Sequence, residues 1–117
     1  MSNERVARAV APRLPRHTLD RLRESLEEQR RFRRQQLAEF ATVPAGHPAA
    51  GQLEVQHQLA ASARMVLDDV EAALERMDDG SFGRCELCTR PVEQARLEIV
   101  PQARYCVRCH LVREAMR

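Results

Sequence analysis

Four cysteines are the residues of this chain whose type and spacing point most directly to chemistry. They form two Cys-x2-Cys pairs, Cys85 with Cys88 and Cys106 with Cys109, and the chain has no other cysteine. Two such pairs can supply four thiolates to one tetrahedral ion, which is the ligand pattern of structural zinc sites. We therefore predict that these four cysteines bind one structural zinc ion.

Two other uses of these cysteines remain open at the level of sequence. The two pairs could form disulfides, and His110 could replace Cys109 as the fourth ligand. A closed site of four thiolates leaves no position for water, which argues against metal-assisted hydrolysis. The other histidines are too scattered for a second site, and no Ser/His/Asp arrangement stands out. We expect a protein without catalytic residues, and not an enzyme.

The composition favours long exposed helices over a thick core. Of the 117 residues, 31% are charged, only 3% are aromatic and none is tryptophan. Residues 80–110 are too few to bury enough apolar area alone, so we expect the metal to stabilise them. Four thiolates and one zinc ion would reduce the formal charge of +2 to zero. The overall charge therefore gives no reason to expect direct, sequence-specific DNA binding.

Two amphipathic stretches precede the cysteines. Thr18 is a plausible N-cap for a helix that runs to about Ala41, and a second helix is expected from about Gln52 to Asp79. Between them, residues 42–51 contain two prolines and two glycines. Each helix carries a seam at heptad spacing. The first seam comprises Leu19, Leu22, Leu26, Gln29, Arg33, Gln36 and Phe40, and the second comprises Gln56, Leu59, Ala63, Val66, Val70, Ala73 and Met77.

The two seams fit each other when the chain folds back on itself. Residue numbers that face each other should then sum to about 96, which also places Arg21 level with Glu75 for an exposed ion pair. We predict a mainly α protein in three parts. A flexible basic arm (1–16) precedes an antiparallel coiled-coil hairpin (17–79, tip loop 42–51). A small zinc finger with four cysteine ligands, followed by a short terminal helix from His110 to Arg117, completes the chain (80–117).

The sequence shows no apolar run long enough for a membrane span and no signal-peptide pattern near its start. We expect no membrane association, and a reduced cytoplasm suits metal-binding cysteine pairs better than disulfides. A monomer is the expected state.

The cysteines lie within a longer motif. It reads Gly80-Ser-Phe-Gly-Arg-Cys-Glu-Leu-Cys88, then Arg90-Pro-Val92, Arg96-Leu97 and Pro101, then Tyr105-Cys-Val-Arg-Cys109. This pattern resembles the DksA/TraR family of zinc proteins that bind bacterial RNA polymerase. The resemblance implies a globular head from which the coiled coil protrudes into the polymerase secondary channel, without DNA binding. It also implies that tip-loop residues bind the partner, here Pro44, Ala45, Gly46, His47 and Pro48.

The chain departs from the family pattern at two places. Thr89 stands where the family usually has glycine, which implies strain if that position is left-handed. Residues 42–51 contain no acid, whereas the family tip normally carries a pair of aspartates followed by alanine. We expect a regulator that binds RNA polymerase but lacks the acidic tip. Two alternatives are a structural adaptor without polymerase insertion, and a nucleic-acid-binding zinc ribbon that uses Arg30–Arg34 and the basic N-terminal arm.

Overall fold

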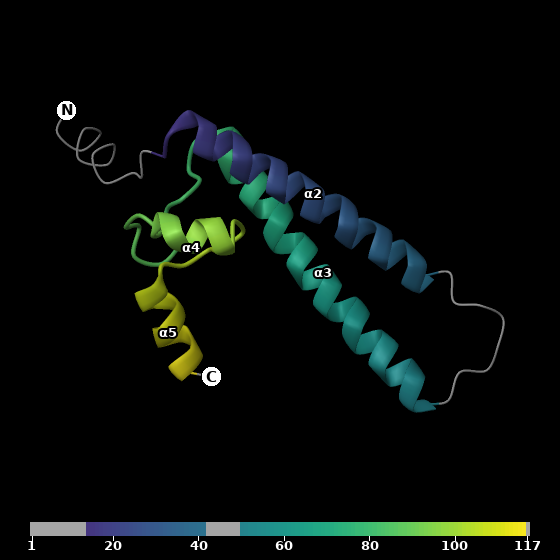
Figure 1. The fold of residues 1–117 in the computed structure, drawn as a ribbon. Coiled ribbons are helices and arrows are strands. Elements are labelled where there is room, and N and C mark those ends of the chain that lie inside the picture. The colour runs from purple at the N-terminus through teal and green to yellow at the C-terminus, as the bar shows by residue number, and fades with distance from the viewer. Residues whose placement is uncertain (1–13, 42–49, 117) are drawn as a thin grey trace.

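The computed structural model describes residues 14–41 and 50–116, which form an elongated molecule of 64 × 34 × 24 Å. Its helices are α2 (Arg16–Ala41), α3 (Ala50–Asp79), α4 (Gln94–Ile99) and α5 (Val107–Ala115), and these segments contain no strand beyond an isolated bridge between Arg84 and Pro91. Figure 1 shows α2 and α3 as a long hairpin, with α4 and α5 gathered at one end. The predicted fold, a mainly α protein with a helical hairpin and a small finger, is confirmed. None of the described helices combines the length and apolarity needed to cross a membrane.

The first helix begins earlier than predicted. The backbone N–H of Leu19 donates to the carbonyl of Pro15 at 3.0 Å, so helical hydrogen bonding is established before Thr18. Pro15 directly precedes Arg16, the first residue of α2, and its carbonyl accepts the first hydrogen bond of the helix, as the carbonyl of an N-cap residue does. Thr18 is therefore buried inside α2, and its predicted role as N-cap is wrong.

The second helix also starts two residues earlier than expected, at Ala50, so that Gly51 lies within α3. The remaining residues assigned to the tip loop, including Pro44, Ala45, Gly46, His47 and Pro48, lie outside the described residues. Nearly all of the predicted basic arm, residues 1–16, lies outside them as well.

The core lies at the end of the hairpin next to the finger. Leu22 and Leu26 of α2 are buried with apolar side chains of α3 and of the finger in one continuous cluster. The members contributed by α3 and the finger are Val70, Ala73, Leu74, Phe82, Cys85, Val92, Leu97, Ala103 and Cys106. Because both parts of the chain contribute to a single core, the finger and the base of the hairpin form one packed unit.

The far half of the hairpin is less well packed. Gln29, Arg33 and Gln36 of α2 are only half-buried, and Leu59 of α3, which the seam pattern places inside, is 49% exposed. Polar side chains cannot be buried without partners, so this part of the seam offers little drive for close packing. Figure 1 shows α2 and α3 separating toward the ends that face residues 42–49. The predicted burial of Leu59 is wrong for this reason.

Ion pairs across the hairpin show how the helices align. Arg23 pairs with Asp78 at 3.1 Å, and Arg34 pairs with Glu71 at 2.5 Å. In both pairs the residue numbers sum to more than 96. Side chains lean toward the N-terminus of their own helix, so two side chains that meet belong to residues slightly further along both antiparallel helices. Arg21 pairs with Glu98 of α4, so the predicted pairing with Glu75 is wrong.

Candidate metal centre

The first cysteine pair lies in a tight backbone knuckle. The N–H of Cys85 donates to the carbonyl of Arg90 at 2.8 Å, and the N–H of Thr89 donates back to the carbonyl of Cys85 at 3.0 Å. Next to these two bonds, the N–H of Val92 donates to the carbonyl of Gly83 at 2.8 Å. Gly83 has a φ of 86°, a backbone conformation that residues with a side chain rarely adopt. These bonds turn Cys85 and Cys88 toward the same point.

The second pair lies at the start of α5. Cys106 is the N-cap residue with an extended backbone (φ −65°, ψ 166°), and its Sγ accepts from the N–H of Cys109 at 3.5 Å. The N–H of His110 donates to the carbonyl of Cys106 at 2.9 Å. Because the cysteine itself caps the helix, α5 begins at Val107, and the prediction that the terminal helix begins at His110 is wrong.

The four sulfur atoms form a compact group. All lie within 4.8 Å of one another, and the Sγ atoms of Cys88 and Cys106 are 3.8 Å apart. A tetrahedral ion with Zn–S bonds of about 2.3 Å requires sulfur atoms about 3.8 Å apart. All four cysteines are free, so the disulfide alternative does not hold. The finger fits one structural zinc ion, as the sequence predicts.

The protonation of the thiols also fits a metal centre. Burial raises the pKa of Cys85, but the N–H groups of Cys88, Cys106 and Leu87 outweigh it and lower this pKa to about 6. Desolvation, followed by the surrounding sulfur atoms, raises the pKa of Cys109 to about 12. Without a cation the four groups cannot all ionise, because each thiolate disfavours the next. A divalent ion removes this conflict by neutralising the shared charge.

One histidine and three of the arginines that lie close to the cysteines in the sequence have side chains that differ in what they contact. His110 is not part of the sulfur group, and its Nε2 lies 4.0 Å from Glu114, which gives no support to its use as a ligand. Arg90 and Arg108 line a hollow together with three of the four cysteines. Their guanidinium groups can offset the negative charge of a four-thiolate zinc centre. Arg104, which lies two residues before Cys106 in the sequence, instead contacts Asp69 of α3.

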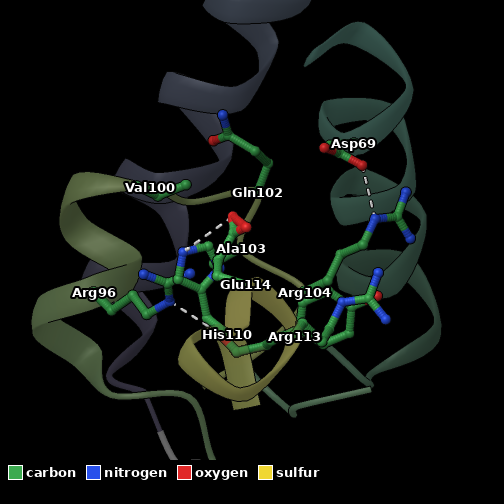
Figure 2. A pocket seen from close by; sticks show the side chains of 10 residues that line it. Asp69, Arg96, Val100, Gln102, Ala103, Arg104, His110, Arg113 and Glu114 are labelled. Atoms are coloured by element: carbon green, nitrogen blue, oxygen red, sulfur yellow. Dashed lines mark hydrogen bonds and ion pairs between the residues drawn. The ribbon is translucent and has the colours of Figure 1, made fainter. Parts of the chain in front are cut away.

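A charged network joins the finger to the hairpin. The Nε of Arg104 donates to Asp69 of α3 at 2.7 Å, and its Nη1 donates to Glu86 at 3.2 Å. Arg76 of α3 reaches the same Glu86 carboxylate at 3.3 Å. Figure 2 shows Arg104 extending from the finger toward Asp69. The hydrogen bond to Asp69 raises the pKa of Arg104 above its usual value. The sequence did not reveal this network, because charges far apart in the chain carry no pairing signal.

A hollow of about 390 Å³ lies beside this network, and residues of α3, α4 and α5 line it (Figure 2). Its cationic side chains already serve internal contacts. Arg96 donates to the carbonyl of Tyr105 at 2.9 Å, and the guanidinium of Arg113 lies 4.6 Å from the centre of the Tyr105 ring. These contacts hold α4 and α5 against the second cysteine pair.

Thr89 carries the backbone strain that its identity implies. Its φ is 63°, in the left-handed region that favours glycine. The hydroxyl of Thr89 donates to the carbonyl of Cys88 at 2.6 Å, which offsets part of the cost. The position after the second cysteine is therefore left-handed here.

Comparison with known proteins identifies proteins that are similar to this chain in its zinc finger and in its fold. Residues 80–115 match the family model of the prokaryotic dksA/traR C4-type zinc finger. The structure of the transcription factor DksA2 from Pseudomonas aeruginosa is similar, with a TM-score of 0.72 over 94% of this chain and 96% of that chain. The sequence identity is 22%, so this likeness establishes the fold. The resemblance to the DksA/TraR family predicted from the motif is confirmed.

Two curated proteins share parts of the sequence. An uncharacterized protein of Aquifex aeolicus is 30% identical over 79 residues, which is 64% of this chain and 54% of that protein. The general stress protein 16O of Bacillus subtilis is 43% identical over 44 residues, which is 38% of this chain and 27% of that protein. The chain thus spans about half or less of the length of the curated relatives that it matches.

Proposed function

We propose that this chain, which carries a DksA/TraR zinc finger on a DksA-like fold, is a non-enzymatic transcription regulator that binds bacterial RNA polymerase. In this proposal the hairpin of α2 and α3 enters the polymerase secondary channel. Cys85, Cys88, Cys106 and Cys109 are the ligands of the zinc ion. The protein acts as a monomer in the cytoplasm.

The observation that carries the proposal is the shape of the hairpin and the way it is anchored. The 30 residues of α3 give a helix about 45 Å long, and where α2 and α3 pack together near the finger the pair is only about 20 Å across. The base of this rod shares its core with the finger, and the network of Asp69, Arg104 and Glu86 adds polar contacts there. A narrow rod fixed to a broader head suits insertion into a pore, with the head stopping at the rim.

Zinc has a structural role in this scheme. Four thiolates fill a tetrahedral site, so no position is left for a substrate or a reactive water. The metal holds the two cysteine pairs together, and with them the elements that support the hairpin base. Its loss should loosen the head and, through the shared core, the direction in which the rod points.

The tip differs from that of the family it resembles. Residues 42–51 contain no aspartate or glutamate. In this proposal the tip therefore brings no carboxylate to the magnesium site in the active centre of the polymerase. We propose that it occupies the channel and competes with other channel-binding factors. Pro44, Ala45, Gly46, His47 and Pro48 are the proposed tip contacts, although they lie outside the described residues.

The proposal can be tested by site-specific crosslinking to core RNA polymerase. A photocrosslinker at each of positions 45–49 should react with loops of the active centre. The same group in place of Ile99, which is 81% exposed on α4, should react only with the outer rim. Competition with a known secondary-channel factor should remove the tip crosslinks. If the tip positions and position 99 label the same rim surface, the hairpin does not enter the channel.

A further inference from the structure

Charge is distributed unequally along the hairpin. The half next to the finger, residues 16–28 and 67–79, carries ten carboxylates and four arginines. The far half, residues 29–41 and 50–66, carries five arginines and only two carboxylates, Glu39 and Glu54. The far half is therefore a cationic segment on a rod whose base is strongly acidic.

The five arginines, Arg30, Arg31, Arg33, Arg34 and Arg64, are here called the arginine collar. Four of them come from one stretch of α2, where a turn of 100° per residue spreads them over an arc of about 160°. Arg64 adds a cation from α3, and its side chain is exposed. The positive charge thus faces outward in several directions instead of forming one flat patch.

Much of this charge has no use within the described part of the molecule. Arg34 pairs with Glu71, and Arg33 donates to Gln36 at 3.0 Å and lies over the ring of Phe32. Arg30, Arg31 and Arg64 have no hydrogen bond or ion pair among the described residues. Phe32, which is 59% exposed, adds an apolar surface between two of these arginines. Arginine and exposed aromatic side chains together are typical of protein contact surfaces.

We infer that the arginine collar contacts an acidic protein wall that surrounds the hairpin. This inference rests on the proposed function, and it specifies the chemistry of the channel surface that this segment meets. Charges spread around a rod at one level complement a carboxylate-lined pore, whereas a nucleic-acid strand would contact one side only. The acidic base and cationic far half also orient the protein, so that the far half leads into an acidic opening.

The test uses the full-length protein, core RNA polymerase free of nucleic acid, and two triple variants at the unpaired positions. The first variant combines Arg30→Gln, Arg31→Gln and Arg64→Gln, and the second places Lys at the same three positions. Loss of three exposed ion pairs should weaken polymerase binding about tenfold at low salt. The Lys variant should bind within about twofold of the wild type, because it keeps the charge. The difference between the Gln variant and the wild type should shrink as salt rises toward 1 M, where the Debye length is about 3 Å.

Each other outcome would overturn the inference. If the Gln variant binds polymerase as tightly as the wild type at every salt concentration, the collar does not contact the channel, although the proposed insertion stands. Failure of the wild type to bind polymerase at all overturns the proposed function, and the inference with it. If single-stranded RNA binds the wild type as tightly as polymerase does, and the Gln variant loses that binding, the partner of the collar is nucleic acid. Circular dichroism of both variants checks that α2 and α3 remain helical.

Discussion

Replacing Leu97 by alanine should destabilise the hairpin as well as the finger. Leu97 lies on α4 within the finger, its exposed fraction is 0%, and it belongs to the same buried cluster as Leu22, Leu26 and Val70. The substitution would leave a cavity between the finger and the hairpin base. If the two parts form one cooperative unit, the loss must appear in the unfolding of the long helices.

The magnitude follows from the burial. Removing a fully buried leucine side chain costs about 2–5 kcal/mol, which combines the lost transfer free energy with the cost of the cavity. With a urea m value of about 1.5 kcal/mol per molar, a loss of about 3 kcal/mol lowers the unfolding midpoint by about 2 M. The m value itself should stay unchanged, because the same surface is exposed on unfolding.

Urea titration of the zinc-loaded protein, followed by circular dichroism at 222 nm, measures this effect. Most of the helical signal comes from α2 and α3, which have 26 and 30 residues. Ile99→Ala is a matched control, because Ile99 lies on the same short helix but is 81% exposed, and its loss should cost less than about 0.5 kcal/mol. Equal midpoints for the two variants would show that the finger does not support the hairpin through this core.

Four other perturbations test the finger and its junction. Thr89→Gly should raise the stability of the zinc-loaded protein by about 1 kcal/mol, since it relieves a φ of 63°, whereas Thr89→Ala should give no gain in a thermal melt. Zinc binding at neutral pH should release protons, because the pKa of Cys109 is raised to about 12, so calorimetric enthalpies should vary with the buffer. Because the pKa of Cys85 is lowered to about 6, the stability that its thiolate contributes is complete above the usual thiol pKa and is lost as the pH falls through about 6. Zinc affinity should therefore drop steeply near that pH. Arg104→Gln should cost about 1 kcal/mol, and combining it with Asp69→Asn should cost less than the sum of the two; full additivity would mean that the pair is not coupled.

The elements that depend on local pattern could be predicted from the sequence. The cysteine spacing predicts the metal site because the backbone of each Cys-x2-Cys pair closes on itself. The end of α2 at Ala41 follows from the prolines and glycines that come after it, and the end of α3 at Asp79 follows from Gly80, whose φ is 83°. Each signal lies within a few residues of the feature that it predicts.

The features that depend on tertiary contacts were not predicted. Helix α4, with only six residues, carries too little periodicity to be recognised, and Leu97 stabilises it by packing on the hairpin. The start of α5 depends on the side chain of Cys106, whose role as a helix cap appears only once the second knuckle has formed. Arg104 lies two residues before Cys106 in the sequence, but its side chain contacts Asp69 of α3, 35 residues earlier, which no local pattern predicts.

The two halves of the hairpin differ in packing and in charge. Apolar residues such as Leu26 and Val70 concentrate at the base, where the finger completes their burial. The far half has glutamine and arginine in its seam, which lowers its own packing energy but leaves cations exposed along the rod. A seam that was apolar throughout would hold the helices together without the finger, and zinc removal would then barely change the hairpin. The polar far seam instead makes the hairpin depend on its base, so the metal should govern whether the arginine collar is presented in a fixed direction.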